Sequence, residues 1–377
     1  MRFLMLNWRD PKNPISGGAE RVTLAHLLAL VERGHEVFWY TNDFPGGARE
    51  EVFERIKIVR GGGKGSSILK AISWYRRQPR FDLVMDQHHG FPWFAPWWCN
   101  TNCVAYIHEV LGPIWSAFYP EPVSTIGRWQ ERWTHWLYRN VPFWTPSEST
   151  KKDLHAHGVR SVTVIPNGIY GGSGDLLRLL PDTPPLAMLE EKPLQLPLRL
   201  ICVSRSAPNK RVEHAIQAVK CLADRNIPVQ LKVVGVGDAK VELERLTKSL
   251  NLQDKVIFTG YLSEEQKNSA LREAHFLVHT SMREGWGLNV IEANAMGTPA
   301  AVYPVGGLID STVPGQTGLV TTAETPESLA DALAGIIKTP ELYSRYRVSA
   351  WERSKTFSWK EILPQMAAWL EASAQKH

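Results

Sequence analysis

The stretch FLVHTSMREGWGLNVIEANAMGTPAAVYPV, residues 276 to 305, decides the fold. Its two apolar, β-rich ends, 276–281 and 299–305, flank a run of small and apolar residues with helical spacing that begins near Leu288. Two short strands that enclose a helix form a βαβ unit, and such units build parallel sheets. We therefore expect an α/β fold.

Two acids in this stretch, Glu284 and Glu292, lie eight positions apart. In one continuous helix, eight residues at about 100° each would leave the carboxylates roughly 80° apart, too skewed for a shared face. A strand, loop and helix instead place Glu284 in the loop and Glu292 in the early helix, where both can line one pocket. Free backbone N–H groups between them would face an anion. The alternatives are a glycosidase-like carboxylate pair, or a Glu292 that only satisfies the helix N-terminus.

The same alternation of strands and helices recurs along all 377 residues, more than one core usually organises. It predicts two doubly wound parallel sheets, in 1–168 and 198–356, joined by a Gly- and Pro-rich linker at 169–197. Ligands of such sheets bind beyond the carboxyl ends of the strands. The predicted strands are 2–6, 36–41, 82–87, 103–109, 141–147 and 162–167, then 198–205, 229–237, 256–261, 276–281 and 299–305.

The composition is that of a folded protein, with 21% charged and 44% hydrophobic residues and a net charge of +5. This charge permits anionic substrates or lipid surfaces, but the chain lacks the dense Lys/Arg stripe of a nucleic-acid-binding protein. No stretch approaches the roughly 20 apolar residues that span a bilayer. None of the cysteines has the C-x2-C spacing of a metal or redox site. We expect reduced thiols and a cytoplasmic protein, soluble or peripheral at the membrane.

Two loops after predicted strands carry residues suited to phosphate. Gly17 and Gly18 precede a helix, where backbone N–H groups bind anions, although two glycines also suit a plain turn. Arg205 and Lys210 bracket a turn and could hold a diphosphate, or could be a solvated basic turn. The glycine pair at 235 and 237 is a weaker candidate, because tight packing explains these two glycines better than cofactor binding does. His108 ends the strand at 103–109, where a catalytic and a structural role are equally plausible.

The first half is rich in tryptophan, notably in FPWFAPWW (91–98) and IGRWQERWTHWLYRN (126–140). In the second stretch the tryptophans recur with the spacing of a buried helical stripe, which favours core burial. Tryptophan is also enriched at membrane interfaces and stacks on sugar rings, and the arginines of 126–140 suit anionic lipid. Peripheral membrane contact and an acceptor platform therefore remain as alternatives. The residues concerned are Trp129, Trp133 and Trp136, with Arg128, Arg132 and Arg139.

Taken together, these residues resemble a known family, the retaining glycosyltransferases of family 4. Members of this family have the GT-B fold, in which two Rossmann-like domains face a cleft. The resemblance extends over nearly the whole chain and includes FSWKEI (357–362), which resembles the start of a helix that crosses back to the first domain at about 357–377. The motifs that carry it are GGAERVTLAHLLALVERGHEV (17–37), VTVIPNGI (162–169), SRSAPNKR (204–211) and EGWGLNVIEANAMGTPAAVYPVGGLIDSTVPGQTGLV (284–320).

The resemblance implies a role for each matching residue. It implies that Arg205 and Lys210 bind the donor diphosphate, and that Glu292 hydrogen-bonds the nucleotide ribose. Glu284 would hold the donor sugar, and His108 would lie near the sugar's C6 hydroxyl. The remaining donor-binding positions that it implies are Gly17 and Gly18 at the diphosphate, Gly260 and Tyr261 at the base, and Gly285, Trp286, Gly287 and Leu288 along the sugar and distal phosphate.

The resemblance also implies the reaction: transfer of a hexosyl unit from a UDP- or GDP-sugar to a saccharide or lipid-linked acceptor, with retention of configuration. The departing phosphate would accept the acceptor's proton, so Arg205 and Lys210 would carry the chemistry together with His108 and Glu284. The chain has no Asp-x-Asp, the motif that holds a metal in the other glycosyltransferase fold, and we expect no metal or cofactor. A same-fold epimerase or phosphorylase, and a catalytically silent nucleotide-sugar sensor, are the alternatives.

Overall fold

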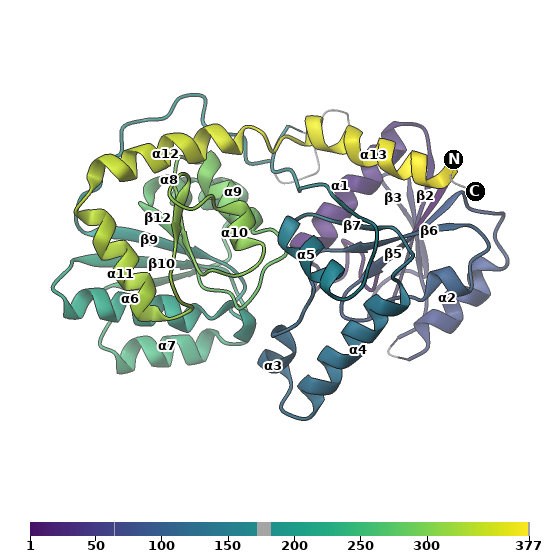
Figure 1. The fold of residues 1–377 in the computed structure, drawn as a ribbon, viewed down its shortest axis with the longest axis horizontal. Coiled ribbons are helices and arrows are strands. Elements are labelled where there is room, and N and C mark those ends of the chain that lie inside the picture. The colour runs from purple at the N-terminus through teal and green to yellow at the C-terminus, as the bar shows by residue number, and fades with distance from the viewer. Residues whose placement is uncertain (64, 172–181, 376–377) are drawn as a thin grey trace. The chain divides into compact units, whose positions relative to one another are not determined.

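The computed structural model describes residues 1–63, 65–171 and 182–375. The described residues fall into two compact units. Unit 1 takes them from Met1–Val110, Trp129–Leu180 and Ser358–His377, and unit 2 from Leu111–Arg128 and Pro181–Phe357. Each unit holds a mostly parallel sheet with helices packed on it (Figure 1), so the expected α/β class with two parallel sheets is confirmed.

The sheet of unit 1 is parallel except at one edge, where β3 and β4 form an antiparallel hairpin that the sequence did not predict. The hairpin turn consists of Glu54 and Arg55, which both have positive φ, 49° and 66°. In order across the sheet the strands are β3 (Glu50–Phe53), β4 (Ile56–Arg60), β2 (Glu36–Thr41), β1 (Arg2–Leu6), β5 (Leu83–His88), β6 (Asn102–Ile107), β7 (Phe143–Thr145) and β8 (Val162–Val164).

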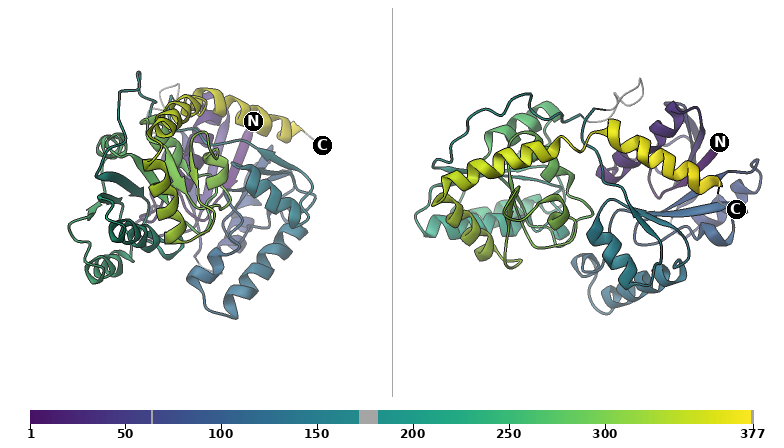
Figure 2. Two further views of the ribbon diagram at one scale, coloured as in Figure 1. Left: turned by 60° about the vertical axis from the view of Figure 1, so that its left-hand side comes forward. Right: turned by 45° about the horizontal axis from the view of Figure 1, so that its top comes forward.

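The C-terminal helix α13 (Trp359–Gln375) belongs to unit 1 and lies beside α1 (Gly18–Glu32), as Figure 2 shows. Glu371 of α13 accepts hydrogen bonds from the Arg33 guanidinium, with both N–O distances 2.7 Å, and lies 2.7 Å from His35 Nε2. The remaining helices among the described residues of this unit are α2 (Ser67–Tyr75), the 3-10 turn η1 (Ala95–Trp97), α5 (Glu148–Ala156) and most of α4 (Val123–Leu137).

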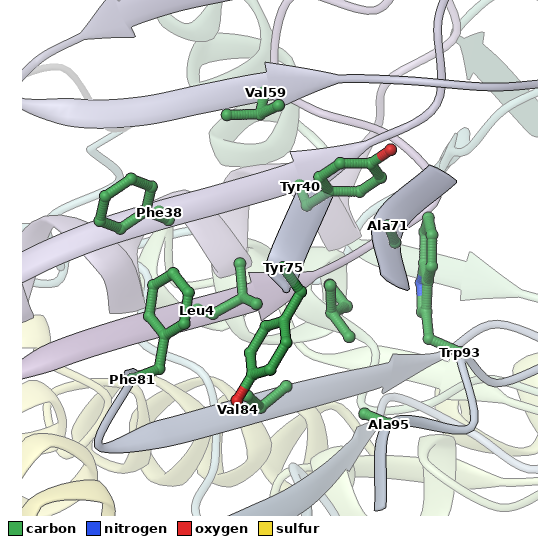
Figure 3. Packing of buried hydrophobic residues seen from close by; sticks show 11 residues of the cluster. Leu4, Phe38, Tyr40, Val59, Ala71, Tyr75, Phe81, Val84, Trp93 and Ala95 are labelled. Atoms are coloured by element: carbon green, nitrogen blue, oxygen red, sulfur yellow. The ribbon is translucent and has the colours of Figure 1, made fainter. Parts of the chain in front are cut away.

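A buried aromatic core lies between α2 and the strands β1, β2, β4 and β5 (Figure 3). Phe81 meets Phe38 edge to face, with ring centroids 5.2 Å apart, and stacks with Tyr75 at 5.6 Å. Trp93, which is fully buried, closes one end of the core against Tyr40. Because each such ring buries a large apolar area, this cluster contributes much of the packing that orients the strand ends of unit 1.

The sheet of unit 2 is parallel throughout its described strands. The unit predicted from residues 276–305 is present as β12 (Phe276–His279), α9 (Leu288–Ala295) and β13 (Ala300–Val302). Helices α6 and α7 cover one face of the sheet, and α8 and α9 the other (Figure 1). The other elements are β9 (Leu198–Val203), β10 (Val229–Val234), β11 (Val256–Gly260), β14 (Gly318–Val320), η3 (Pro208–Lys210), α3 (Ile114–Phe118), α6 (Val212–Asp224), α7 (Lys240–Ser249), α8 (Glu264–Glu273), α10 (Leu308–Ser311), α11 (Pro326–Ile337) and α12 (Pro340–Ser354).

The predicted linker at 169–197 falls partly outside the described residues, because 172–181 are not described. Its later part is held on unit 2 by several hydrogen bonds. The ammonium of Lys192 reaches the carbonyl oxygens of Arg272 and Ala274, at 2.9 and 2.6 Å, and Thr298 Oγ1 at 2.7 Å. Trp351 Nε1 donates to the carbonyl of Leu186 at 2.8 Å. Residues 186–192 therefore pack as part of unit 2.

Candidate functional site

The centre of the candidate site is an ion pair at the carboxyl ends of β9 and β12. Lys210 Nζ lies 2.6 Å from Glu284 Oε2, and His279 Nε2 lies 3.4 Å from the same oxygen. Lys210 ends η3 in the loop after β9, and Glu284 lies in the loop after β12, as the sequence predicted. Both side chains stay accessible, at 16% and 20%. The pair therefore combines partial desolvation with access for a ligand.

The charges around Glu284 favour its ionised form. Burial opposes ionisation, but the charge and hydrogen bond of Lys210, together with the charge of Arg205, outweigh it, so the pKa of Glu284 lies below its ordinary value. Burial lowers the pKa of His279 to about 4, against the opposing effect of Glu284. His279 is therefore neutral at neutral pH, and the cations facing Glu284 are Lys210 and the exposed Arg205. His279 is a neighbour that sequence reasoning missed.

A close approach of two loops fixes the backbone at Glu284. The Glu284 N–H donates to the carbonyl of Gly306 at 3.3 Å, in the loop after β13. Next to it, a Cβ on Gly307 would lie 2.0 Å from the Glu284 carbonyl oxygen, and Gly307 has φ +78°. Only glycine fits there, because both the contact and the backbone angle exclude a side chain. Gly307 therefore holds the Glu284 loop in place.

The segment after Glu284 leads directly into α9. Gly287, with φ +77°, precedes the first helical residue, Leu288, which confirms the predicted helix start. The indole of Trp286 is buried and meets the Phe357 ring edge to face at 5.3 Å. Its side chain is thus used for packing, and what this segment can offer a ligand is its backbone.

Glu292 projects from the second turn of α9 and meets a lysine that the sequence did not point to. Lys267 Nζ, on α8, lies 3.0 Å from Glu292 Oε2 and 2.7 Å from Glu264 Oε2. Burial opposes the charge on Lys267, but the two glutamates outweigh it and raise its pKa. Lys267 therefore holds Glu292 at a defined position, with 18% of the Glu292 side chain exposed.

The loops after β9, β10 and β11 pack tightly against one another. A Cβ on Gly235 would lie 2.0 Å from the Ser204 carbonyl oxygen, and one on Gly237 would lie 2.4 Å from that of Ser206. Close packing thus explains these two glycines, as favoured from the sequence. Gly235 N–H also donates to the Gly260 carbonyl at 2.8 Å, while the Tyr261 side chain is 71% exposed.

The predicted glycine loop of unit 1 leads into α1, with Gly17 directly before the helix and Gly18 as its first residue. The Gly17 N–H donates to Glu20 Oε2 at 2.6 Å, and Glu20 is paired with Arg9 at 3.0 Å. A Cβ on Gly17 would meet only the Glu20 carboxylate, at 3.8 Å, and one on Gly18 would meet nothing within 4 Å. Neither glycine has a positive φ. Packing and backbone conformation therefore give no reason for glycine at these two positions.

His108 follows β6 and takes part in a hydrogen-bonded network within unit 1. Gln87 Nε2 lies 3.1 Å from His108 Nε2, and Gln87 Oε1 accepts from Thr23 Oγ1 at 3.0 Å. The amide nitrogen can only donate, so His108 Nε2 accepts. Its Nδ1 lies 3.3 Å from Tyr106 Oη. Gln87 and Thr23 thus set the orientation of the ring, and no sequence motif identified them.

The expectation that the tryptophans of 126–140 are buried is wrong, because α4 exposes them. We call these residues with Ile126 the aromatic face of α4; the exposed fractions are 59% for Ile126, 67% for Trp129, 44% for Trp133 and 51% for Trp136. The buried face of the helix is polar instead and includes Glu131, Thr134 and His135. Beside the aromatic face lies a cavity of about 350 Å³, lined by its three tryptophans with Arg132 and residues 156–158.

Among the described residues no helix combines the length and hydrophobicity that crossing a membrane requires. The same part of the chain holds no group of three or more His, Cys, Asp or Glu side chains placed to share a metal ion.

Comparison with known proteins gives two family matches that together cover most of the chain. Residues 191–353 match the model described as Glycosyl transferases group 1, and residues 16–170 match Glycosyltransferase Family 4. A curated relative, mannosylfructose-phosphate synthase of Agrobacterium fabrum, is 31% identical over 46% of this chain. D-inositol 3-phosphate glycosyltransferase of Corynebacterium glutamicum is 30% identical over 44%. The matched stretches span about two fifths of the length of these relatives, 40% and 41%.

Solved structures share the fold over almost the whole chain. Sucrose-phosphate synthase from Thermosynechococcus elongatus has a TM-score of 0.75 at 20% identity, with 98% of each chain covered. The Anabaena protein HepE in complex with UDP-glucose has a TM-score of 0.72 at 17% identity, with 99% of this chain and 100% of the other covered. At these identities the likeness shows the fold, which is the GT-B fold expected from the sequence.

Proposed function

The chain belongs to glycosyltransferase family 4, and on that premise we propose that it transfers a hexosyl unit from a UDP- or GDP-sugar to a saccharide or lipid-linked acceptor, retaining configuration and using no metal. The observation that carries the proposal is the Lys210–Glu284 pair at the carboxyl ends of two parallel strands. The complex of the structurally similar HepE with UDP-glucose favours a nucleotide-sugar donor.

The donor diphosphate would bind to Lys210 and Arg205. As the bond to the sugar breaks, negative charge builds up on the leaving diphosphate, and cations placed there stabilise the transition state more than the ground state. Lys210 is paired with Glu284 at 2.6 Å, and the exposed Arg205 adds a second, planar donor. These two side chains would supply the charge stabilisation that other glycosyltransferases take from a metal ion, which supports a metal-independent reaction.

The carboxylates of Glu284 and Glu292 would bind different parts of the donor. Glu284 would accept hydrogen bonds from hydroxyls of the transferred sugar, and Glu292 from those of the ribose. Each carboxylate has about four lone-pair positions, so pairing with Lys210 or Lys267 leaves room for ligand hydroxyls. Both side chains remain partly exposed, at 20% and 18%, which such contacts require.

Unit 1 holds Gly17, Gly18 and His108, to which the family resemblance assigns donor contacts. Gly17 and Gly18 have no packing or conformational need for glycine, so the backbone there is open to approach by the diphosphate that the family resemblance places at this loop. His108 would contact the sugar from the ring orientation that Gln87 sets. The incoming acceptor hydroxyl would attack from the face that the diphosphate leaves, and the departing phosphate would take its proton, which retains the configuration.

A thermal-shift screen with UDP-, GDP- and ADP-sugars tests the donor. A ligand at one hundred times its Kd stabilises a protein by about 2.7 kcal/mol, so one nucleotide class should raise the Tm by a few degrees. The rise should shrink in Glu292→Ala and persist in Lys220→Ala, which removes an exposed pair with Asp224. No shift with any nucleotide-sugar would contradict the proposal. Incubation without acceptor distinguishes a transferase from an epimerase, and phosphate dependence would reveal a phosphorylase.

The aromatic face of α4 supports a second proposal, that the protein contacts the inner face of the cytoplasmic membrane through 126–140. Four large apolar side chains are exposed on one side of a helix, which is costly in water and favourable at a lipid headgroup boundary. Arg132 lines the adjoining cavity, and Arg139 lies over the Trp136 ring at 4.2 Å. Tryptophan and arginine are the residues that such boundaries favour.

Cosedimentation with vesicles that contain anionic lipid tests the contact. Changing the three tryptophans of the aromatic face to serine should abolish binding with only a small loss of stability, because the side chains are 44–67% exposed. The matched control is Trp97→Ser, which removes an exposed tryptophan (51%) outside α4. Equal vesicle binding by the triple variant and the parent would refute the membrane proposal and leave the donor proposal intact.

A further inference from the structure

Two thiols of unit 1 are in contact with each other. Cys99 Sγ and Cys103 Sγ lie 2.8 Å apart, and Cys99 Sγ also lies 3.6 Å from the Thr101 carbonyl oxygen, so the chain curls between the two cysteines. Cys99 comes two residues after η1, and Cys103 is the second residue of β6. Side chains whose sulfurs already touch can be joined by a disulfide with little movement of the backbone.

A polar cavity of about 300 Å³ lies at Trp98 and Asn100, the two chain neighbours of Cys99. It is lined by Tyr75, Arg76, Gln78, Arg80, Trp98 and Asn100, so the residues on either side of Cys99 both face it. Tyr75 Oη donates to Asn100 Oδ1 at 2.9 Å, and Tyr75 lies over β5 next to Val84, which is the strand partner of Cys103 (Figure 3). Two arginines in the wall give the cavity a positive charge, which suits an anionic molecule.

The two thiols differ in acidity in the way a redox pair requires. The hydrogen bond from Cys103 lowers the pKa of Cys99, and the same contact, with burial, raises that of Cys103. Burial raises the pKa of Cys202 and of Cys221 as well. Cys99 is therefore the thiol with the greatest tendency to ionise, and the thiolate is the form that attacks a disulfide.

We propose that Cys99 and Cys103 form a thiol–disulfide pair that is oxidised by a small anionic disulfide bound in the Arg76–Arg80 cavity. The Cys99 thiolate attacks one sulfur of the oxidant, forms a mixed disulfide and releases one thiolate of the oxidant. Cys103 then loses its proton and attacks Cys99 Sγ, which forms the Cys99–Cys103 bond and releases the second thiolate. The two cysteines are oxidised by two electrons in total, and the oxidant is reduced to two thiols.

The bond would tie the segment after η1 to β6. The ring that it closes, residues 99–103, lies between the aromatic segment 91–98 and the strand that leads to His108. Oxidation would fix the start of β6 to the chain that precedes it. The pair lies outside the donor site, so this proposal is independent of the function proposed above.

Treatment of the full-length protein with oxidised glutathione, followed by peptide mapping without reduction, tests the proposal. The expected product is a peptide with a Cys99–Cys103 bond, two hydrogens lighter and free of glutathione. In Cys103→Ser the second step is blocked, so a stable glutathione adduct should accumulate on Cys99. Cys221→Ser is the control and should form the 99–103 bond unchanged.

The cavity has its own test. Arg76→Ala should slow the reaction with oxidised glutathione and leave that with neutral hydroxyethyl disulfide unchanged. Equal slowing of both reactions, or of neither, would refute the role of the cavity. Persistence of free thiols at Cys99 and Cys103 while Cys221 becomes modified, or no adduct on Cys99 in Cys103→Ser, would overturn the redox pair.

Discussion

Replacing Lys210 by methionine keeps the length and apolar stem of the side chain and removes the charge beside Glu284. At 2.6 Å and an effective dielectric constant of about 20, the attraction between the two charges is about 6 kcal/mol. Desolvation of both ions and lost side-chain freedom offset most of it, and a net charge-assisted hydrogen bond contributes about 1.5–3 kcal/mol. With the two side chains 16% and 20% exposed, we expect Lys210→Met to lower the free energy of unfolding by about 2 kcal/mol at pH 7.

The loss of unfolding free energy in Lys210→Met should depend on pH, and the pKa of Glu284 determines the direction of this dependence. In the parent protein the folded pKa of Glu284 is lowered, so its contribution is present above the unfolded pKa and is lost as pH falls. Without Lys210 the remaining burial raises the folded pKa, and keeping the carboxylate ionised at pH 7 becomes unfavourable. Protonation relieves this, so the difference between variant and parent should shrink towards pH 5.

Urea unfolding at pH 7 and pH 5 measures the effect, with Lys220→Met as the matched control. The exposed Lys220–Asp224 pair should change the free energy of unfolding by less than about 0.5 kcal/mol at either pH. A loss for Lys210→Met that equals the control, or that is the same at both pH values, would refute the account of the Lys210–Glu284 pair.

Two further predictions concern the loop that holds Glu284 and the helix that closes unit 1. Gly307→Ala should both lower the Tm and weaken donor binding, because the added Cβ would lie 2.0 Å from the Glu284 carbonyl oxygen and displace the loop. Unchanged donor affinity would show that the loop tolerates this displacement. Glu371→Gln should lower stability at neutral pH, since pairing with Arg33 and His35 lowers the pKa of Glu371 to about 2. That contribution is present above the unfolded pKa and fades as pH falls towards 2, so parent and variant should unfold alike near pH 2, and a constant difference would contradict it.

The fold could be predicted because its signals are local. In residues 276–305 the sequence signals for the strands, the loop glycines and the helix start all lie within thirty positions. In the structure α9 begins at Leu288, as expected. The β3–β4 hairpin was missed because its turn carries no local signal. Turns with two positive φ angles favour Asn and Gly, and here the positions are Glu54 and Arg55.

Site residues that directly follow a strand could be predicted from the sequence. Residues that join the site only through tertiary packing could not. Lys210 and Glu284 were both found at strand ends, and the structure joins them directly. Lys267 was missed because it lies on α8 and meets Glu292 only through tertiary packing. Gln87 lies inside a buried strand, where a polar residue next to His108 leaves no motif.

The predicted burial of the tryptophans of α4 was wrong for a different physical reason. Helical spacing shows that side chains share a face but not whether that face points inward. In α4 the core side is taken by polar residues, including His135, whose Nδ1 lies 2.8 Å from His157 Nδ1. Burial of that polar face leaves the tryptophans outside.

The most direct test of the central claim is the affinity of the protein for its nucleotide-sugar, measured by calorimetric titration with the donor that the thermal-shift screen identifies. Replacing Lys210 or Glu292 by alanine should each weaken binding about 10- to 100-fold, as expected for loss of one charge-assisted contact, while Lys220→Ala binds like the parent. Unchanged donor affinity in both Lys210→Ala and Glu292→Ala, with the fold intact, would contradict the assignment of this site to the donor.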